Sequence, residues 1–245
     1  MTESDKNQTG SPPDTPQRRP IRSYVVRGGR LTSSQRKALE TYSADFVIDY
    51  RPQLLDLQTL FANNNPVIVE IGFGMGDSLL TMASAMPENN FIGIEVHKPG
   101  IGKLLMGLGR EAVTNVRVIN HDAREVMEHC FSDGSLDGVQ IFFPDPWHKK
   151  RHHKRRLIQA EFVDLLARKL KPDGLLHLAT DWQPYAEQML DVLENRIFLI
   201  NEAGTGNYST PGSRPATKFE NRGRKLGHGV WDIRFRRKSN PASAG

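Results

Sequence analysis

The chain has 245 residues, of which 38% are hydrophobic and 25% are charged, and its formal net charge at pH 7 is +5. This length suits one large domain, and the single cysteine, Cys130, excludes an intrachain disulfide and a cysteine-based zinc cluster. No apolar run is long enough to span a membrane, and the polar N-terminus lacks the apolar core of a signal peptide, so we expect a cytoplasmic protein whose positive charge suits a polyanionic partner.

Composition divides the chain into four segments. Residues 1–20 are rich in Ser, Thr, Pro, Asn and Gln without an apolar period, which predicts a disordered polar tail. Residues 21–65 form a basic N-terminal segment with short helices, one of which Ser33 or Ser34 caps. Residues 66–238 carry the folded domain, and residues 239–245 are expected to be a flexible C-terminus.

Short apolar runs rich in Val, Ile and Phe alternate with amphipathic segments in residues 66–238. This alternation predicts an α/β fold, with a doubly wound, mostly parallel, Rossmann-like sheet, one antiparallel strand and helices on both faces. The seven predicted strands are 67–71, 91–95, 116–119, 137–143, 174–179, 197–200 and 230–235. Three sets of apolar residues at helical spacing should face the sheet: Leu79, Met82, Ala83 and Met86; Ile158, Phe162, Leu165 and Leu166; and Ala186, Met189, Leu190 and Leu193. The second of these helices is followed by a stop signal at Lys171–Gly174.

The first predicted strand ends in a glycine-rich loop, Glu70–Asp77. Glycines at this point let the backbone turn tightly and let a nucleotide ligand approach the main chain. The spacing is G-x-G-x-G, whereas the dinucleotide fingerprint G-x-G-x-x-G would require glycine at Asp77. The carboxylate of Glu70 would repel a pyrophosphate, but it suits S-adenosylmethionine, which carries a sulfonium and an ammonium group and no phosphate. We therefore expect this cofactor, held by Glu70, Gly72 and Gly74.

Acidic residues follow the next two predicted strands. Glu95 ends the second strand, where an acid accepts hydrogen bonds from ribose hydroxyls, and Asp122 follows the third, where it can receive the adenine amino group. Structural alternatives exist, because Asp122 can cap the helix that begins near Arg124 and Asp77 is best explained as the cap of the first helix. Acids at three successive strand ends nevertheless favour a cofactor site.

The fourth predicted strand ends in the sequence Phe-Pro-Asp-Pro-Trp at Phe143–Trp147. The prolines fix φ and favour extended conformations before them, so a stiff turn presents Asp145 and Trp147. If the sheet is doubly wound, this turn lies beside the first strand and places Asp145 over the transferred methyl group. The alternative is an ordinary Pro-Asp turn with Trp147 packed on the core.

A basic run follows the turn directly, with six Lys or Arg among the nine residues 148–156. Such a run is usually a solvated surface, but at the mouth of a catalytic crevice it should bind phosphates. His148, His152 and His153 lie in the same run. We expect no metal, because the neighbouring cations oppose a divalent ion and no acidic ligand is close in sequence.

Five motifs stand along the chain: Glu70–Gly76, Gly93–His97, Phe143–Lys149, Thr180–Trp182 and Thr217–Gly223. Together they resemble the bacterial tRNA (guanine-N7)-methyltransferases, a family of class I S-adenosylmethionine-dependent methyltransferases. The resemblance runs from about Arg22 to Arg236. It implies that residues 66–238 are a catalytic methyltransferase domain and that the substrate is tRNA, with the guanine at position 46 of the variable loop as the family's target.

The resemblance also implies roles for individual residues. Those that contact or border S-adenosylmethionine would be Glu70, Glu95, Asp122 and Asp145, and Asp145 would be the catalytic acid. The substrate nucleotide would be held by Lys149, Asp181, Thr217, Lys218, Phe219 and Glu220. The RNA would be touched by Arg151, His152, His153, Lys154, Arg155 and Arg156. Two structural alternatives stay open, since Asp181 also resembles the N-cap of a helix and residues 217–220 can be a solvated basic loop.

The chemistry needs no general base, because guanine N7 bears a free lone pair. The enzyme must align the lone pair, the methyl carbon and the sulfur, and Asp145 would stabilise the cationic purine that forms. Two competing functions are methylation of an exocyclic amine in DNA or RNA, whose Asx-Pro-Pro-aromatic turn has no match here, and noncatalytic RNA binding, against which the intact acids argue. Whether the protein is a monomer or a homodimer is not determined by its sequence.

Overall fold

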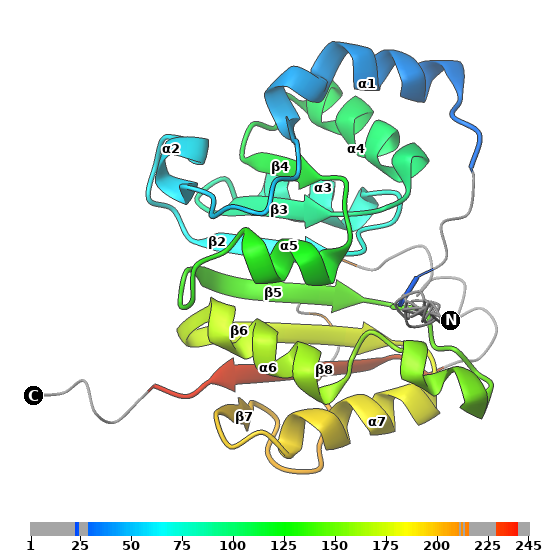
Figure 1. The fold of residues 1–245 in the computed structure, drawn as a ribbon, viewed down its shortest axis with the longest axis vertical. Helices are drawn as coiled ribbons and strands as arrows, with labels where there is room; N and C mark the ends of the chain where they lie inside the picture. The colour runs from blue at the N-terminus through cyan, green and yellow to red at the C-terminus, as the bar shows by residue number, and fades with distance from the viewer. Residues whose placement is uncertain (1–22, 25–28, 211, 213, 216–228, 240–245) are drawn as a thin grey trace, which may run out of the picture.

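The computed structural model describes residues 23–24, 29–210, 212, 214–215 and 229–239, and their strands form one sheet (Figure 1). The strand order is β1-β4-β3-β2-β5-β6-β8-β7. The strands are β1 (Val47–Ile48), β2 (Val67–Ile71), β3 (Asn90–Ile94), β4 (Val116–Ile119), β5 (Leu136–Phe142), β6 (Leu170–Thr180), β7 (Leu199–Asn201) and β8 (Trp231–Arg237). All neighbouring pairs are parallel except those of β8, which confirms the predicted Rossmann-like sheet with one antiparallel strand. The predicted tail of residues 1–20 lies outside the described residues.

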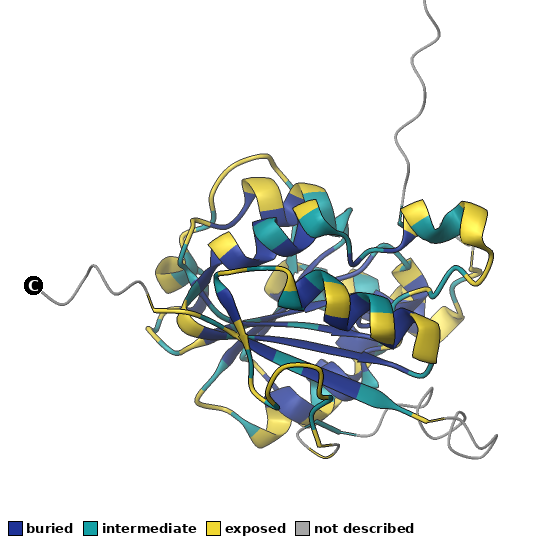
Figure 2. Cartoon of the chain, turned by 90° about the horizontal axis from the view of Figure 1, so that it is seen from below, coloured by how far each residue is buried: buried dark blue, intermediate teal, exposed yellow. Residues whose placement is uncertain are grey.

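Helices cover both faces of this sheet. The first face carries α1 (Ser33–Phe46), α3 (Asp77–Ala85) and α4 (Lys98–Glu111), and the second carries α5 (Ala123–His129), α6 (Ala160–Lys169) and α7 (Gln183–Glu194). Two shorter helices lie in connections, α2 (Leu57–Phe61) and the 3-10 helix η1 (Lys150–Arg155). Figure 2 shows the strands largely buried, and the helices exposed along their outer sides. Each face of the sheet therefore has its own apolar core.

All seven predicted strands are present, and apart from β6 their ends shift by no more than two residues. β6 begins at Leu170 because that residue already pairs with Leu136, before the chain bulges out over residues 171–174. The predicted stop signal therefore lies inside the strand, with Asp173 at a φ of 62°. The sequence missed β1, a two-residue strand at the edge of the sheet, so the described sheet has eight strands instead of seven.

The cap of α1 is one residue earlier than expected. The hydroxyl of Thr32 accepts a hydrogen bond from the backbone N–H of Gln35, and the side chain of Gln35 accepts one from the backbone N–H of Thr32. This reciprocal pair satisfies two backbone donors at the start of the helix. Neither Ser33 nor Ser34 is the cap; both lie in the first turn of α1.

Asp77 does not cap α3, contrary to expectation. The N-cap is Gly76, which has no side chain to offer, and Asp77 is the first residue of the helix. The Asp77 carboxylate pairs instead with Lys103 of α4. Asp77 therefore ties together the two helices that support the glycine loop.

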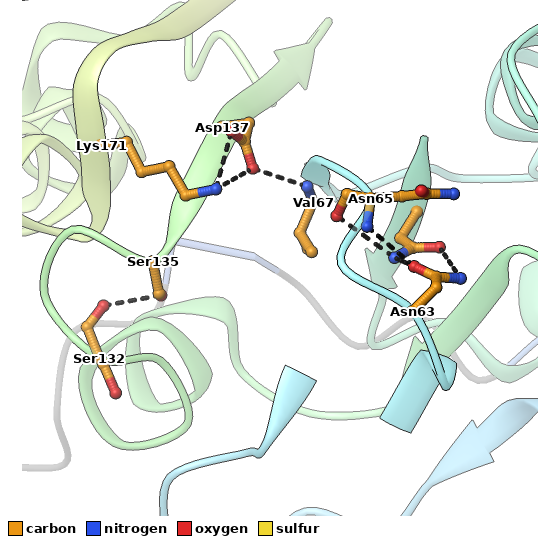
Figure 3. Close-up of polar contacts among 8 residues, drawn as sticks. Asn63, Asn65, Val67, Ser132, Ser135, Asp137 and Lys171 are labelled. Carbon is orange, nitrogen blue, oxygen red and sulfur yellow. Dashed lines mark hydrogen bonds and ion pairs between the residues drawn. The ribbon is translucent and has the colours of Figure 1, made fainter. Parts of the chain in front are cut away.

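A polar cluster fixes the amino ends of the central strands (Figure 3). The carboxylate of Asp137, at the start of β5, accepts a hydrogen bond of 2.8 Å from the backbone N–H of Val67 and pairs with Lys171 at 2.7 Å. The side chains of Asn63 and Asn90 hydrogen-bond nearby, at 2.7 Å, which links β3 to the chain that enters β2. These contacts set the relative positions of β2, β3, β5 and β6 at the amino ends of the strands, opposite the site.

Candidate active site

Two adjoining cavities open at the carboxyl ends of β2, β3 and β5, where the strand order reverses. The larger, of about 250 Å³, is lined by these strand ends and by His121 and Asp145. The smaller, of about 110 Å³, is lined by Glu70 and residues 72–78. Four residues line both: Gly72, Gly74, Phe142 and Phe143. The cavities are therefore two parts of one site, at the place where α/β sheets bind ligands.

The glycine loop lines both cavities. Gly72, Gly74 and Gly76 have φ values of 73°, 57° and 76°, in the left-handed region that favours glycine. A Cβ added to Gly72 or Gly74 would meet nothing within 4 Å, whereas one added to Gly100 of α4 would collide with the carbonyl oxygen of Gly74. The loop therefore rests on α4 and leaves open space beside Gly72 and Gly74.

Glu70, near the end of β2, is 2% exposed and borders the smaller cavity. Burial raises the pKa of its carboxyl group to about 8, although the positive charge of Arg214 opposes the rise, and the charge of Glu95 adds to it. The Oε2 atom of Glu70 is buried without a hydrogen-bond partner. A buried carboxylate with an unused acceptor at a cavity wall suits a cationic group of a ligand.

Glu95 lines the larger cavity and also holds the glycine loop. Its carboxylate accepts hydrogen bonds from the backbone N–H groups of Gly74 (2.8 Å), Val96 (2.7 Å) and His97 (2.9 Å). The sequence did not indicate this structural role. Carboxylate oxygens have several acceptor sites, so Glu95 retains capacity to receive a hydroxyl group from a ligand in the cavity.

Asp122 is the N-cap of α5, and its Oδ1 accepts a hydrogen bond of 2.8 Å from the backbone N–H of Arg124. The structural interpretation of Asp122 is thus confirmed, while its contact with adenine stays a prediction. The preceding residue, His121, lines the larger cavity and stacks on Tyr50, with ring centroids 3.6 Å apart and planes 9° apart. The sequence did not indicate this stacked pair, because Tyr50 and His121 are far apart in the chain.

The Phe143–Trp147 turn leaves β5 at the wall of the larger cavity, with Asp145 exposed. Phe143 and Trp147 have φ values of 53° and 45°, and such backbone geometry costs on the order of 1–3 kcal/mol for a non-glycine residue. The Trp147 indole donates a hydrogen bond of 3.2 Å to the carbonyl oxygen of Ser23, and the Arg155 guanidinium lies 4.9 Å from its ring. Trp147 therefore connects the turn to the N-terminal segment and to the basic run.

The basic run forms the surface helix η1 next to this turn. Its cationic side chains are exposed at Lys149, Lys150, Arg151, Lys154 and Arg155, while His152 and His153 are half-buried. Partial burial, followed by the charges of the surrounding cations, lowers the pKa of His152. His152 therefore contributes less positive charge at neutral pH than the lysines and arginines beside it.

Two residues of the predicted set lie differently from expectation. Arg156 was expected to contact RNA, but it is only 3% exposed and its guanidinium lies inside the protein. Asp181 is half-buried and is not an N-cap, because Trp182 occupies that position in α7 and donates its backbone N–H to Thr180 Oγ1 (3.2 Å). The substrate role of Asp181 stays a prediction. Four further predicted substrate residues lie outside the described residues: Thr217, Lys218, Phe219 and Glu220.

A buried charge network that the sequence did not indicate lies next to the start of the Phe143–Trp147 turn. Asp232 of β8 accepts hydrogen bonds from Arg214 at 2.8 and 3.2 Å and lies 2.8 Å from His177 Nε2 of β6. Burial alone would raise the pKa of Asp232, but the hydrogen bonds from His177 and Arg214 lower it below its ordinary value. The Arg214 guanidinium lies 5.2 and 5.1 Å from the rings of Phe142 and Phe143. The network thus packs, through Arg214, against the two phenylalanines at the start of the turn.

Within the described part of the chain, no group of three or more His, Cys, Asp or Glu side chains is placed to hold a metal ion. The helices in that part include none that is both long enough and apolar enough to cross a membrane.

Comparisons with known proteins cover the same domain. Residues 64–233 match a family model described as "Putative methyltransferase". A tRNA (guanine-N(7)-)-methyltransferase of Paracidovorax citrulli is 57% identical over 229 residues, which are 93% of this chain and 92% of that protein. One of Methylobacillus flagellatus is 58% identical over 223 residues, 90% of this chain and 93% of that protein.

A solved structure has the same fold at low sequence identity. It is a 16S rRNA (adenine(1408)-N(1))-methyltransferase variant of Catenulisporales acidiphilia with the cosubstrate S-adenosylmethionine, and it is 15% identical to this chain. The match covers 81% of this chain and 96% of that one, with a TM-score of 0.54. At this identity the likeness establishes the architecture of the sheet and its helices only.

Proposed function

The chain belongs to the tRNA (guanine-N(7)-)-methyltransferase family, and from this premise and the geometry of the site we infer how its residues carry out the reaction. It is an enzyme that methylates N7 of guanine in tRNA. The observation that carries this conclusion is the high identity to such enzymes over nearly the whole chain. A tRNA substrate also implies that the enzyme works in the cytoplasm.

S-adenosylmethionine is the methyl donor that the site fits; when bound, it supplies an electrophilic methyl group on a sulfonium. The unpartnered oxygen of Glu70 and the open space beside Gly72 and Gly74 support this choice. Glu70 is suited to the cationic groups of the cofactor, Glu95 to the ribose hydroxyls and Asp122 to the adenine amino group. The backbone of Gly72 and Gly74 allows the close approach that this arrangement requires.

Asp145 stabilises the charge that develops on the purine. N7 attacks with its own lone pair, so no residue has to remove a proton before the transfer. The product purine is cationic, and a fixed carboxylate near the ring favours the transition state over the neutral substrate. Asp145 meets this need because it lines the larger cavity and comes from a turn stiffened by two prolines.

The tRNA binds across the exposed cations next to Asp145. The exposed side chains of η1 and Lys149 supply phosphate contacts, which contribute affinity without reading sequence. Asp181, at the start of the segment before α7, can accept hydrogen bonds from the guanine N1–H and its exocyclic amine, a pattern that adenine does not offer. The target is the family's guanine at position 46 of the variable loop.

The reaction is tested by incubating the protein with unmodified tRNA and S-adenosylmethionine labelled in its methyl group. Digestion to nucleosides should give labelled 7-methylguanosine, and mapping the modified nucleotide should place it at position 46. Label in a methyladenosine would overturn the base assignment. No transfer to any RNA would overturn the enzyme assignment and support noncatalytic RNA binding.

The role of Asp145 is tested by Asp145→Asn, which keeps the size of the side chain and removes its charge. We expect kcat to fall by about 10²- to 10³-fold, the range for loss of one electrostatic stabiliser, while tRNA binding is retained. Glu161→Gln, an exposed carboxylate in the first turn of α6, is the matched control and should behave as wild type. Equal losses of tRNA binding and turnover in Asp145→Asn would contradict the role.

A further inference from the structure

Arg156 is the one residue of the basic run that turns into the protein. It is 3% exposed, whereas its neighbours Lys154 and Arg155 are exposed. Burial lowers the pKa of its guanidinium, which marks a partly desolvated cation. A phosphate of bound RNA therefore cannot reach it without a rearrangement of the surface, and another role is needed to explain an arginine here.

The contacts of Arg156 lead to the turn that carries Asp145. Its Nε–H donates a hydrogen bond of 2.8 Å to the carbonyl oxygen of Pro146, the residue after Asp145. Its Nη1 donates to the side-chain oxygen of Gln188 in α7. The face of the guanidinium lies 4.7 Å from the ring centroid of Tyr185, also in α7. One planar side chain thus joins the turn to a helix by two hydrogen bonds and a cation–π contact.

The helix side of this connection is itself fixed. Tyr185 is fully buried, and its hydroxyl accepts a hydrogen bond of 3.2 Å from the backbone N–H of Ile158. Gln188 donates from its amide to the carbonyl oxygen of Ile158, also at 3.2 Å. Tyr185 and Gln188 therefore each contact both the Arg156 guanidinium and the backbone of Ile158. The guanidinium is anchored on a rigid base, so its position is determined by the core and not by solvent.

The turn needs such an anchor. Phe143 and Trp147, on either side of the Pro-Asp-Pro sequence, hold left-handed backbone conformations that the chain does not favour by itself. Pro144 and Pro146 restrict φ, but they have no N–H groups with which to fix the turn by backbone hydrogen bonds. The peptide plane after Pro146 is set by whatever its carbonyl oxygen binds, and Arg156 is the donor there.

We propose that Arg156 is a positioning residue for methyl transfer, which holds the Pro146 carbonyl so that the turn presents Asp145 at the cofactor cavity, and that it makes no RNA contact. The proposal rests on the proposed function, since it takes Asp145 as the charge-stabilising residue. It separates Arg156 from the exposed cations of η1, although all of them belong to one run in the sequence.

Arg156→Lys tests the proposal directly, because it keeps the positive charge and removes the planar fork. A lysine satisfies a phosphate as a point charge, but it cannot make both hydrogen bonds and the stacking contact. We expect kcat to fall by about 10- to 100-fold, as small displacements in an active site do, with tRNA affinity and its salt dependence unchanged. Arg110→Lys, at an exposed arginine near the end of α4 that pairs with Glu111, is the matched control and should leave kcat unchanged.

Chemical rescue separates positioning from general damage to the fold. In Arg156→Ala, millimolar methylguanidinium should occupy the vacated space and restore part of kcat, while it should do nothing for Asp145→Asn. Gln188→Ala, which removes only one anchor, should lower kcat by a smaller factor and gives a second reading if Arg156→Ala does not fold. Circular dichroism melting identifies any variant that fails to fold.

The outcomes distinguish this proposal from the proposed function. Wild-type protein that forms no 7-methylguanosine would overturn the function. Wild-type protein that does form it, together with wild-type kcat in Arg156→Lys and in Gln188→Ala, would overturn the positioning role alone. A weaker tRNA affinity with a reduced salt dependence in Arg156→Ala, at unchanged kcat, would make Arg156 an RNA contact and would also overturn it.

Discussion

Glu70 places a carboxyl group where water does not reach, so its ionisation depends on what else occupies the cavity. In the free protein, burial raises its pKa to about 8, which leaves it mostly protonated at neutral pH. A ligand that brings a positive charge next to the unpartnered Oε2 atom favours the ionised form. Binding of S-adenosylmethionine should therefore release a proton from Glu70.

The buried acid also makes the stability of the free protein depend on pH. Below the ordinary pKa of 4.5, Glu70 is protonated in both folded and unfolded chains; between 4.5 and about 8, only the unfolded chain ionises, so stability falls as pH rises through this window. Glu70→Gln has no carboxyl group to ionise and so lacks this loss. The melting temperature of the variant minus that of wild type should therefore increase from pH 5 to pH 8 and stay constant above pH 8. Thermal melts check this, and calorimetry in two buffers should detect proton release on cofactor binding in wild type only. A constant difference in melting temperature across this range would contradict the raised pKa.

The roles of single residues were predictable where they depend on position along a strand, and not where they depend on the direction of a side chain. Glu70 and Asp145 lie at strand ends, so the topology alone brought them to the two adjoining cavities of one site. In the sequence, Arg156 cannot be distinguished from the other cations of the basic run. Its inward direction depends on hydrogen bonds to Pro146 and Gln188, and the sequence does not show that these residues lie next to it. The prediction that Asp181 caps α7 was wrong because the N-cap is the next residue, Trp182, and the helix begins at Gln183.

At the scale of elements, the buried network of His177, Arg214 and Asp232 joins β6 to β8 in addition to their main-chain pairing. Asp232→Ala removes the carboxylate that His177 and Arg214 share, and with it both hydrogen bonds from the buried Arg214 guanidinium. We expect the free energy of unfolding to fall by roughly 3–5 kcal/mol. Glu111→Ala, which breaks an exposed pair with Arg110, should cost less than about 1 kcal/mol by the same urea titration.

A second variant shows whether that loss comes from the unpaired charge. Replacing both partners by apolar residues, in Arg214→Met with Asp232→Leu, removes the buried guanidinium together with the carboxylate and should recover much of the stability that Asp232→Ala loses. Stability as low as in Asp232→Ala would instead point to poorer packing at Phe142 and Phe143, against which Arg214 lies.

β1 and α4 were not identified individually from the sequence, for opposite reasons. β1 has only two residues, which is too short for any periodicity to show. α4 has four glycines in fourteen residues, a composition that argues against a helix. Tertiary packing explains them, because a Cβ at Gly102 would press on Gln35 of α1, one at Gly107 on Leu80 of α3 and one at Gly109 on Tyr42. The helix gives up intrinsic propensity so that α1, α3 and the glycine loop can lie against it.

Across the whole molecule, negative and positive side chains occupy separate places at the carboxyl ends of the strands. Glu95 and Asp145 line the larger cavity, Glu70 borders the smaller one and ionises when a cationic ligand binds, and the exposed cations of η1 follow the Asp145 turn in the chain. A negative interior favours the cationic cofactor, while the positive rim attracts a phosphate backbone and keeps it off the carboxylates. The net charge of +5 therefore matters less than its location.

Location is tested by removing the same amount of charge at two places. Arg151→Gln with Arg155→Gln removes two exposed cations from η1, and the slope of log K for tRNA against log salt should become shallower by about 0.7 to 0.9 for each phosphate that the variant no longer binds. Arg110→Gln with Arg168→Gln removes two exposed arginines near the ends of α4 and α6, at the amino ends of the strands and away from the site. This variant should leave the slope close to that of wild type. Cofactor affinity should be unchanged in both, since neither pair lines the cavities. Equal changes of slope in the two variants would mean that tRNA responds to the net charge of the protein and not to a surface at η1.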